Sequence, residues 1–216
     1  MNLLVQTWDL LMANPARFGA ALWTHVLLSA LALLAGAVIA VPLGVRLALS
    51  NRHALLAINL ANVGRTLPSL AVLALAMPLL GTGFVPSLFA LALLALPPIL
   101  LNTYTGVRGV DPDVIDAARG MGMREGEITR RVRLQLALPL IFSGLRTAAA
   151  QVISGATLAA YIGGGGLGEF ITSGVAMMAI PQLLLGAIPA TLLAIGVDAL
   201  FGRLQKTMTP RGLLTS

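Results

Sequence analysis

The chain of 216 residues is 57% hydrophobic and only 10% charged, and its mean hydropathy is +0.91. Soluble domains carry about 25% charged residues, so this composition excludes a water-soluble globular protein and indicates an integral membrane protein. Cysteine is absent, which excludes disulfides, thiolate zinc sites and cysteine nucleophiles, and the net charge of +6 gathers in a few loops, which argues against a surface for nucleic acid.

The uncharged runs of the chain define the expected transmembrane helices, because a hydrocarbon core of about 30 Å needs roughly 20 helical residues. The run 66–107 is too long for one helix, and the turn signal Gly81-Thr82-Gly83 divides it. The fold class that follows is all-α: a polytopic membrane protein with about five transmembrane helices, in a single domain over residues 1–216. The expected spans are 18–45, 54–80, 84–106, 134–160 and 180–202.

The first of these spans has an alternative interpretation. Arg17, an apolar run and Ala35-Gly36-Ala37 resemble a signal peptide with a small-residue cleavage site. The apolar run continues through Val45 and ends at Arg46, as a stop-transfer segment does, whereas a signal peptide has an apolar core of only about 7–15 residues. We therefore favour a transmembrane helix over a cleaved signal.

Positive charge alternates along the chain. The turn 46–53, the segment 109–133 and the tail after residue 202 carry arginine or lysine, whereas the loops 81–86 and 161–179 carry neither. Cytoplasmic loops are enriched in these residues, so the segment 109–133 and the C-terminus are expected in the cytoplasm and the N-terminus outside.

The segment 109–133 is the most charged part of the chain. Asp111 as N-cap, Pro112 at the first helical position and Asp113 in the first turn predict a helix start. Val114, Ile115 and Ala118 fall on one face of this helix, glycines 120 and 122 end or bend it, and a second short helix is expected over 124–133. These residues alone fit either a linker lying on anionic lipid headgroups or a docking element. In the second case, small residues at 117 and 118 would let a partner approach closely.

A family resemblance favours docking. Asp116-Ala117-Ala118, followed after three residues by Gly122, resembles the Glu-Ala-Ala–x3–Gly signature of permease subunits of ATP-binding-cassette (ABC) importers. The stretches "NVGRTLPSLAVLALAMPLLGTGFVPS" and "ATLAAYIGGGGLGEFI" are similar to permeases for osmoprotectants such as glycine betaine, choline and carnitine, and the similarity covers most of 59–170. The resemblance implies type I importer architecture and a cytoplasmic coupling loop, about 109–133, that docks on an ATPase subunit through Asp116, Ala117, Ala118 and Gly122.

The sequence departs from the family pattern at two places. Asp116 stands where the family usually has Glu, and Val132-Arg133-Leu134-Gln135 stands where it has Ile-x-Leu-Pro. Because proline removes a hydrogen bond from a helix interior, its absence at 135 predicts an unbroken helix from about Ile128 to Leu138.

The chain has no loop that could cradle the phosphates of a nucleotide. Such a loop ends in Gly-Lys-Ser/Thr, and the single lysine, Lys206, follows Gln205. We therefore expect a transporter subunit and not an enzyme, with no cofactor of its own and with ATP and magnesium on a separate ATPase chain.

The resemblance further implies the partners and the activity. The partners are cytosolic ABC ATPase subunits, a second permease copy or paralogue, an external substrate-binding protein and membrane lipid. The activity is import of a compatible solute, a quaternary ammonium osmoprotectant, across a bacterial inner membrane by alternating access. The alternatives are a permease for another small solute such as an amino acid, a membrane anchor that recruits a cytosolic partner, and an intramembrane enzyme.

Several polar residues within the spans are candidates for the solute pathway. Arg65 and Arg146 interrupt apolar segments, where an arginine costs at least about 2.5–3.5 kcal/mol. Each either extends to the cytoplasmic surface or lines the pathway, and Asp198 is the expected counter-ion. Further polar positions, which more often bond between helices than contact solute, are Asn102, Tyr104, Gln151, Ser154 and Thr157.

The glycine run Gly163, Gly164, Gly165 and Gly166 falls on the outer side and is too rich in glycine to stay helical. It is either a flexible loop or an external gate. Neither His25 nor His53 has a ligand cluster near it in sequence, so no metal site is expected. No three aromatic residues lie close together in sequence, so the cage that recognises a quaternary ammonium is expected in the binding protein.

Overall fold

The computed structural model describes residues 2–50, 59, 62, 64, 66 and 68–208. Within these residues every regular element is a helix, which confirms the predicted fold class. The elements are α1 (Leu3–Ala13), α2 (Pro15–Leu49), α4 (Ser69–Leu80), α5 (Phe84–Arg108), α6 (Pro112–Gly120), α7 (Glu125–Ile128), the π-turn η1 (Thr129–Arg133), α8 (Leu134–Leu158), the 3-10 turn η2 (Ala159–Ile162), α9 (Gly168–Ala176) and α10 (Ile180–Met208).

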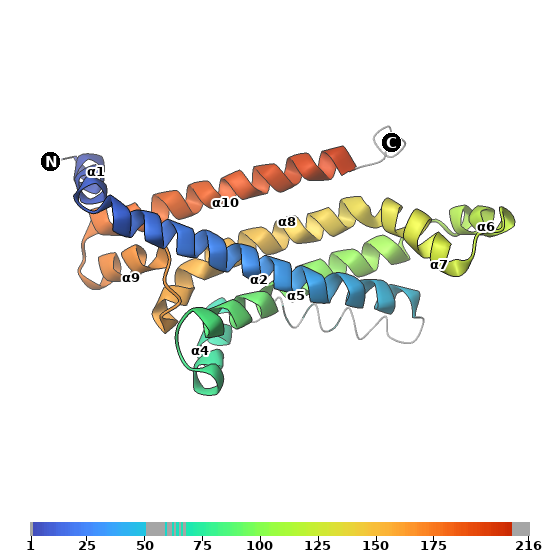
Figure 1. Ribbon diagram of the computed structural model, residues 1–216, viewed down its shortest axis with the longest axis horizontal. Coiled ribbons are helices and arrows are strands. Elements are labelled where there is room, and N and C mark those ends of the chain that lie inside the picture. The colour runs from blue at the N-terminus through green and yellow to red at the C-terminus, as the bar shows by residue number, and fades with distance from the viewer. Residues whose placement is uncertain are drawn as a thin grey trace.

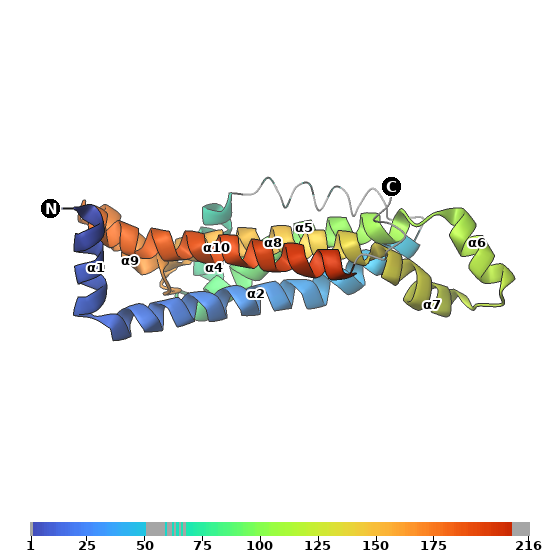
Figure 2. The same ribbon diagram turned by 90° about the horizontal axis from the view of Figure 1, so that it is seen from above.

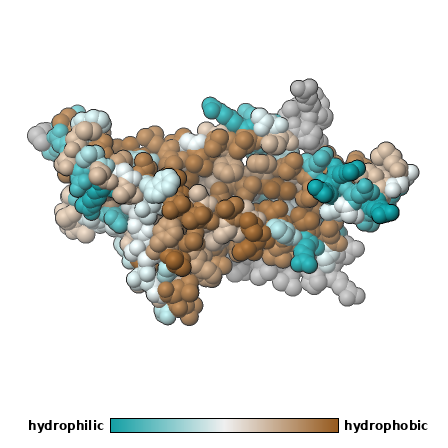
Figure 3. All heavy atoms as spheres, viewed as in Figure 1, coloured by the Kyte–Doolittle hydropathy of each residue, from teal (hydrophilic) through white to brown (hydrophobic). Residues whose placement is uncertain are grey.

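Four helical segments are long and apolar enough to cross a membrane: α2, α5, α10, and the segment from Glu125 to Ile162 that contains α8. They run along one common axis in both views of the ribbon (Figures 1 and 2). Hydrophobic residues cover most of the middle of the face in view, and hydrophilic residues gather toward its two ends and at one place along its upper edge (Figure 3). Four of the five expected spans are thereby confirmed.

The fifth expected span, 54–80, is represented by α4, which has 12 residues. Most of the preceding part of this span lies outside the described residues, as do Arg65 and His53. The turn predicted between this span and the next is confirmed, because Gly81 and Gly83 have φ angles of +78° and +115°. Those angles suit glycine and disfavour other residues.

Small residues let the three central helices approach closely. A Cβ on Gly36 of α2 would lie 2.7 Å from the Cβ of Ala95 on α5, and one on Gly144 of α8 would lie 2.8 Å from the Pro98 carbonyl oxygen of α5. Contacts of this kind are typical of helix pairs in membranes, where dispersion and close backbone packing hold helices together. The buried core therefore lies between α2, α4, α5 and α8, and its largest fully buried members are Leu28, Leu73, Leu91, Ile99 and Val152.

The two ends of the molecule differ in what they carry. The N-terminus, α1 and α9 lie at one end, and α6, α7 and the end of α10 lie toward the other (Figures 1 and 2). Two of these elements, α1 and α9, were not among the expected helices. The first described helix, α1, and the end of α10 thus lie toward opposite ends of the bundle.

Candidate functional site

The coupling loop, residues 109–133, begins as predicted. The Asp111 side chain accepts a hydrogen bond from the backbone N–H of Asp113 (2.9 Å), and Pro112 opens α6. The helix ends at Gly120, and Gly122 has a φ of +83°, although a Cβ added there would meet no other group within 4 Å. At residue 122 the demand for glycine therefore comes from the backbone angle and not from lack of space.

The inner face of the coupling loop forms a small core of its own. Ala118 is 1% exposed and packs with Val110, Ile115 and Ile128. Ala118 therefore faces inward in this chain, whereas Ala117 is exposed. Val114 is 41% exposed, because it lies at the edge of this apolar face and not at its centre.

Ion pairs connect the side chains on the outer face of the coupling loop. Nη1 of Arg119 lies 2.8 Å from Oδ1 of Asp116, and its Nε donates to Oε1 of Glu125 at 2.7 Å, which links α6 to α7. The hydrogen bond from Arg119 lowers the pKa of Glu125, and the same bond raises the pKa of Arg119. All three side chains are exposed, so these bonds fix geometry more than they add stability.

The coupling loop continues without interruption into α8. The helix runs from Glu125 to Ile162, which confirms the unbroken helix predicted over Ile128–Leu138. The π-turn Thr129–Arg133 within it was not predicted. Such turns are rare and often occur at functional sites.

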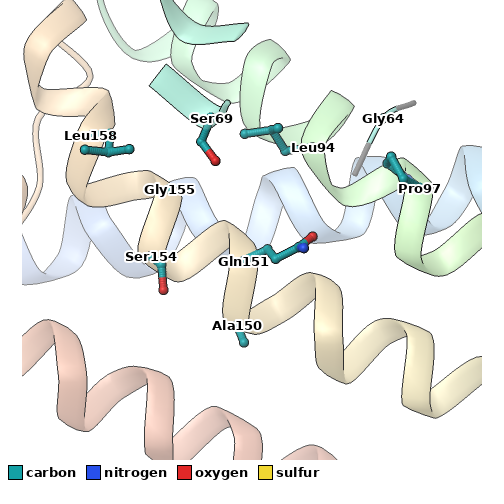
Figure 4. A pocket seen from close by; sticks show the side chains of 9 residues that line it. All are labelled: Gly64, Ser69, Leu94, Pro97, Ala150, Gln151, Ser154, Gly155 and Leu158. Atoms are coloured by element: carbon teal, nitrogen blue, oxygen red, sulfur yellow. The ribbon is translucent and has the colours of Figure 1, made fainter. Parts of the chain in front are cut away.

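A cavity of about 380 Å³ opens beside α4, α5 and α8 (Figure 4). In the close view Gln151 extends from α8 toward α5. The polar side chains of the lining come from Ser69, Gln151 and Ser154, and the part of the lining that the structure describes contains no charged residue. The residues of the lining are Gly64, Ser69, Leu94, Pro97, Ala150, Gln151, Ser154, Gly155 and Leu158.

The polar lining belongs to a longer stripe on α8. Thr147, Gln151 and Ser154 are all exposed and follow one another at spacings of four and three, which places them on one helix face. Polar side chains on a membrane helix are directed toward protein or water rather than lipid. This polar stripe is therefore the surface of the chain best suited to face a solute or a second subunit.

Arg146 has the counter-ion that was expected for it. Its Nε and Nη2 donate to the two carboxylate oxygens of Asp198 on α10, at 2.5 and 2.6 Å. A bidentate pair of this kind is strong and directional.

Two other pathway candidates lie inside the helix bundle. Asn102 donates through Nδ2 to the Pro98 carbonyl oxygen of its own helix (2.8 Å). Tyr104 is only 6% exposed and packs with Ala48, Ala137 and Ile141. These surroundings favour structural roles for both residues.

The glycine run lies between two helices. Three of its members, Gly163, Gly165 and Gly166, have φ angles between +77° and +83°. A Cβ on Gly164 would overlap the hydroxyl of Ser87 on α5, and one on Gly166 would lie 3.2 Å from Cβ and Nδ1 of His25 on α2. The run is therefore a tightly seated connection, which disfavours the flexible-loop interpretation. The sequence did not predict these contacts, because the glycine run, Ser87 and His25 are far apart in the chain.

His25 itself is fully buried, and among the described residues neither ring nitrogen has a hydrogen-bond partner. Among the described residues, no group of three or more histidine, cysteine, aspartate or glutamate side chains could hold a metal ion.

Comparison with known proteins identifies the chain. Residues 32–211 match the model of the family described as binding-protein-dependent transport system inner membrane component. The chain belongs to this family. It is a permease, a multi-pass subunit of an ABC transporter, and not an enzyme.

Three curated relatives indicate the branch of the family to which this permease is similar. It is 42% identical to the choline transport system permease protein OpuBB of Bacillus subtilis over 88% of each chain. It is 41% identical to the carnitine transport permease protein OpuCB of Listeria monocytogenes over 98% of this chain and 90% of the relative. It is 37% identical to the osmoprotectant import permease protein OsmW of Salmonella typhimurium over 97% of this chain and all of the relative.

Solved structures support the architecture of the permease. A chain of the MetNI methionine ABC transporter, in an inward-facing conformation, superposes with a TM-score of 0.79 at 19% identity, covering 90% of this chain and 97% of that one. A chain of an amino acid ABC transporter superposes with a TM-score of 0.71 at 20% identity, covering 93% and 95%. The fold is that of a type I ABC importer permease.

Proposed function

We propose that this permease imports a quaternary ammonium osmoprotectant, of the class of glycine betaine, choline and carnitine, by alternating access. The observation that carries the proposal is the 42% identity to a choline permease over 88% of both chains. The likeness to methionine and amino acid transporters is a likeness of fold at 19–20% identity, so it gives no comparable support for an amino acid as the solute.

The proposed energy source is a separate ATPase that binds ATP and magnesium and docks on the coupling loop. Asp116 and Ala117 are exposed on α6, at the far end of the molecule from α1 (Figure 1). The small core around Ala118 gives this surface a fixed shape. A rigid projection of this kind suits a groove in a partner subunit, and it supports docking over a linker that only rests on lipid.

The proposed orientation places α6, α7 and the C-terminus in the cytoplasm and the N-terminus outside, in a bacterial inner membrane. Arginines lie at the α6 end of the described bundle, at Arg46, Arg108 and Arg203, and this distribution supports the orientation. The glycine run then lies on the outer side, where solute would arrive from the binding protein.

Solute selectivity is proposed to reside mainly in that external binding protein. Tyr104 is buried in the core and Tyr161 is 59% exposed beside the glycine run, so the two tyrosines do not share one cage. The permease would offer a passage of weak affinity, flanked by the polar stripe and completed by a second permease copy or a paralogue.

Reconstitution tests the proposal. The permease, its ATPase and its binding protein are placed in proteoliposomes, and ATP-dependent uptake of labelled glycine betaine, choline and carnitine is measured beside uptake of methionine. We expect uptake of at least one of the first three and none of methionine. Co-purification of an ATPase without any solute uptake would favour the anchor alternative. Uptake of methionine alone would favour an amino acid importer.

Calorimetry of the permease–ATPase complex without binding protein tests where selectivity resides. We expect no measurable affinity for glycine betaine, choline or carnitine. Micromolar binding that is lost in Tyr161→Ala would show a cage in the permease. Tyr161 is the better site for this test, because truncating the buried Tyr104 would also leave a cavity.

A further inference from the structure

Arg146 and Asp198 form an ion pair that joins α8 to α10 within two membrane-spanning helices. Both carboxylate oxygens and two guanidinium nitrogens take part, at 2.5 and 2.6 Å. Neither side chain is buried in the chain: 41% of Arg146 and 43% of Asp198 is exposed. The pair therefore presents unshielded charge to its surroundings.

Arg146 lies on α8 between the cavity and the coupling loop. Arg146, Ala150 and Ser154 follow one another at intervals of four, which places them in one row along the helix. Ala150 and Ser154 line the cavity, and the row from Ser154 to Arg146 covers eight residues, about 12 Å. The row therefore leads from the edge of the cavity to the ion pair, in the direction of the coupling loop.

The pair is also next to a second hollow, nearer the end of α10. Arg146, Ala199, Arg203 and Lys206 contribute to this hollow, which has a volume of about 380 Å³. Asp198 precedes Arg203 by five residues, about 7.5 Å along the helix, so the pair lies inside the position expected for the membrane surface. Gly202 leaves room for the guanidinium of Arg146, whose Nη1 would lie 3.4 Å from a Cβ there.

Half-exposed charges at this depth need a polar medium. Charged side chains facing lipid are costly, and in membrane proteins they face a partner or a water-filled path. A pair with a purely structural role between α8 and α10 could be enclosed by the two helices, whereas 41% of Arg146 and 43% of Asp198 is exposed.

We infer that Arg146 and Asp198 form a charged station on the solute path, which exchanges its internal ion pair for the charges of a zwitterionic solute. This inference rests on the proposed function. Glycine betaine and carnitine each carry a carboxylate and a quaternary ammonium. The guanidinium of Arg146 binds the solute carboxylate with the bidentate geometry that it uses for Asp198, and the released carboxylate of Asp198 faces the ammonium.

The station favours zwitterions over a plain cation. Choline has a hydroxyl where glycine betaine has a carboxylate. Its ammonium interacts with Asp198, but it has no negatively charged group to bind Arg146. The exchange replaces one ion pair by two, which keeps the affinity weak and lets the solute leave. A weak station of this kind is compatible with selectivity that resides mainly in the binding protein.

The test measures initial uptake of glycine betaine and of choline in the same proteoliposomes, containing permease, ATPase and saturating binding protein, and reports the ratio of the two rates. Lysine keeps the charge but not the planar fork, so we expect Arg146→Lys to lower the ratio of glycine betaine to choline uptake by about five- to tenfold. Arg146→Gln should lower it further, and Asp198→Asn should slow both solutes.

Arg203→Gln is the matched control, because it removes a positive charge from the same hollow without touching the pair; it should leave the ratio unchanged. The charge-swapped protein, Arg146→Asp with Asp198→Arg, separates the two roles of the pair. A swap that restores uptake of both solutes with the wild-type ratio, together with an unchanged ratio in Arg146→Lys, would overturn the inference and leave the proposed function standing. Absence of wild-type uptake of either solute would overturn both.

Discussion

Gly166 packs against His25 so closely that a Cβ on the glycine would lie 3.2 Å from both Cβ and Nδ1 of the histidine. The contact holds the end of the glycine run against α2. Because neither ring nitrogen of His25 has a hydrogen-bond partner in the part of the chain that the structure describes, the contact depends on shape and not on polar bonds. It is therefore sensitive to the addition of a single methyl group.

Gly166→Ala should destabilise the outer end of the permease. The substitution adds a methyl group at a tight contact and places a non-glycine residue at a φ of +83°, which costs about 1–2 kcal/mol for the backbone alone. We expect a lower thermal unfolding midpoint of the purified protein and slower uptake. Gly19→Ala on α2 is the control, since a Cβ there meets nothing within 4 Å. Equal thermal unfolding midpoints for the two variants would contradict the close packing of Gly166 against His25.

The orientation can be tested with two single cysteines in the cysteine-free chain. Met178 is 92% exposed after α9 and Met121 is 75% exposed after α6, so both give accessible thiols. Ser87 would be a poor outer site because it is fully buried. Met178→Cys should react with an impermeant maleimide in spheroplasts, and Met121→Cys only after permeabilisation. The reverse labelling pattern would invert the topology.

Gly122→Val should uncouple ATP hydrolysis from transport while leaving membrane insertion intact. A β-branched residue is strongly disfavoured at a φ of +83°, and the surrounding space is open, so the expected effect is a changed path of the loop after α6. Uptake and solute-stimulated ATPase activity are the measurements. Gly126→Val is the control, because residue 126 also has open space but lies in α7 without a positive φ. Normal stimulation in Gly122→Val would remove this glycine from the coupling role.

The bond between Arg119 and Glu125 should make the α6–α7 link sensitive to acid. The pKa of Glu125 is lowered by this bond, so its contribution is fully present above the ordinary value of 4.5 and is lost as pH falls through the lowered value. The difference in unfolding midpoint between wild type and Glu125→Gln should be constant near neutral pH, begin to shrink near pH 4.5 and disappear only below the lowered pKa. High salt should reduce the difference. A difference that grows in acid would contradict this assignment.

Much of the fold could be predicted because burial in a bilayer leaves a simple signal. The charge-free runs located α2, α5, α8 and α10, since few charges are tolerated over the length of a span. The pairing of Arg146 with Asp198 was predictable for the same reason: two opposite charges in apolar surroundings require each other.

Other parts depend on contacts between distant residues and left no local signal. The glycine run contacts His25 of α2 and Ser87 of α5, and each of these looks like an isolated polar residue in the sequence. Ala118 is buried because the chain brings Ile128, ten residues later, into contact with the same small core. The π-turn was missed because Thr129–Arg133 has no proline or glycine to mark it.

That π-turn sets the angular phase between the coupling loop and the polar stripe. A π-turn holds one residue more than an α-turn, so everything after Arg133 is rotated by about 100° relative to an uninterrupted α-helix. The azimuth at which Thr147, Gln151 and Ser154 point is therefore fixed by the five residues just before α8. If this π-turn tightened to an α-turn, or moved along the helix, α8 would rotate about its own axis. The face of α8 that is directed toward the solute would then change, while α6 stayed in place.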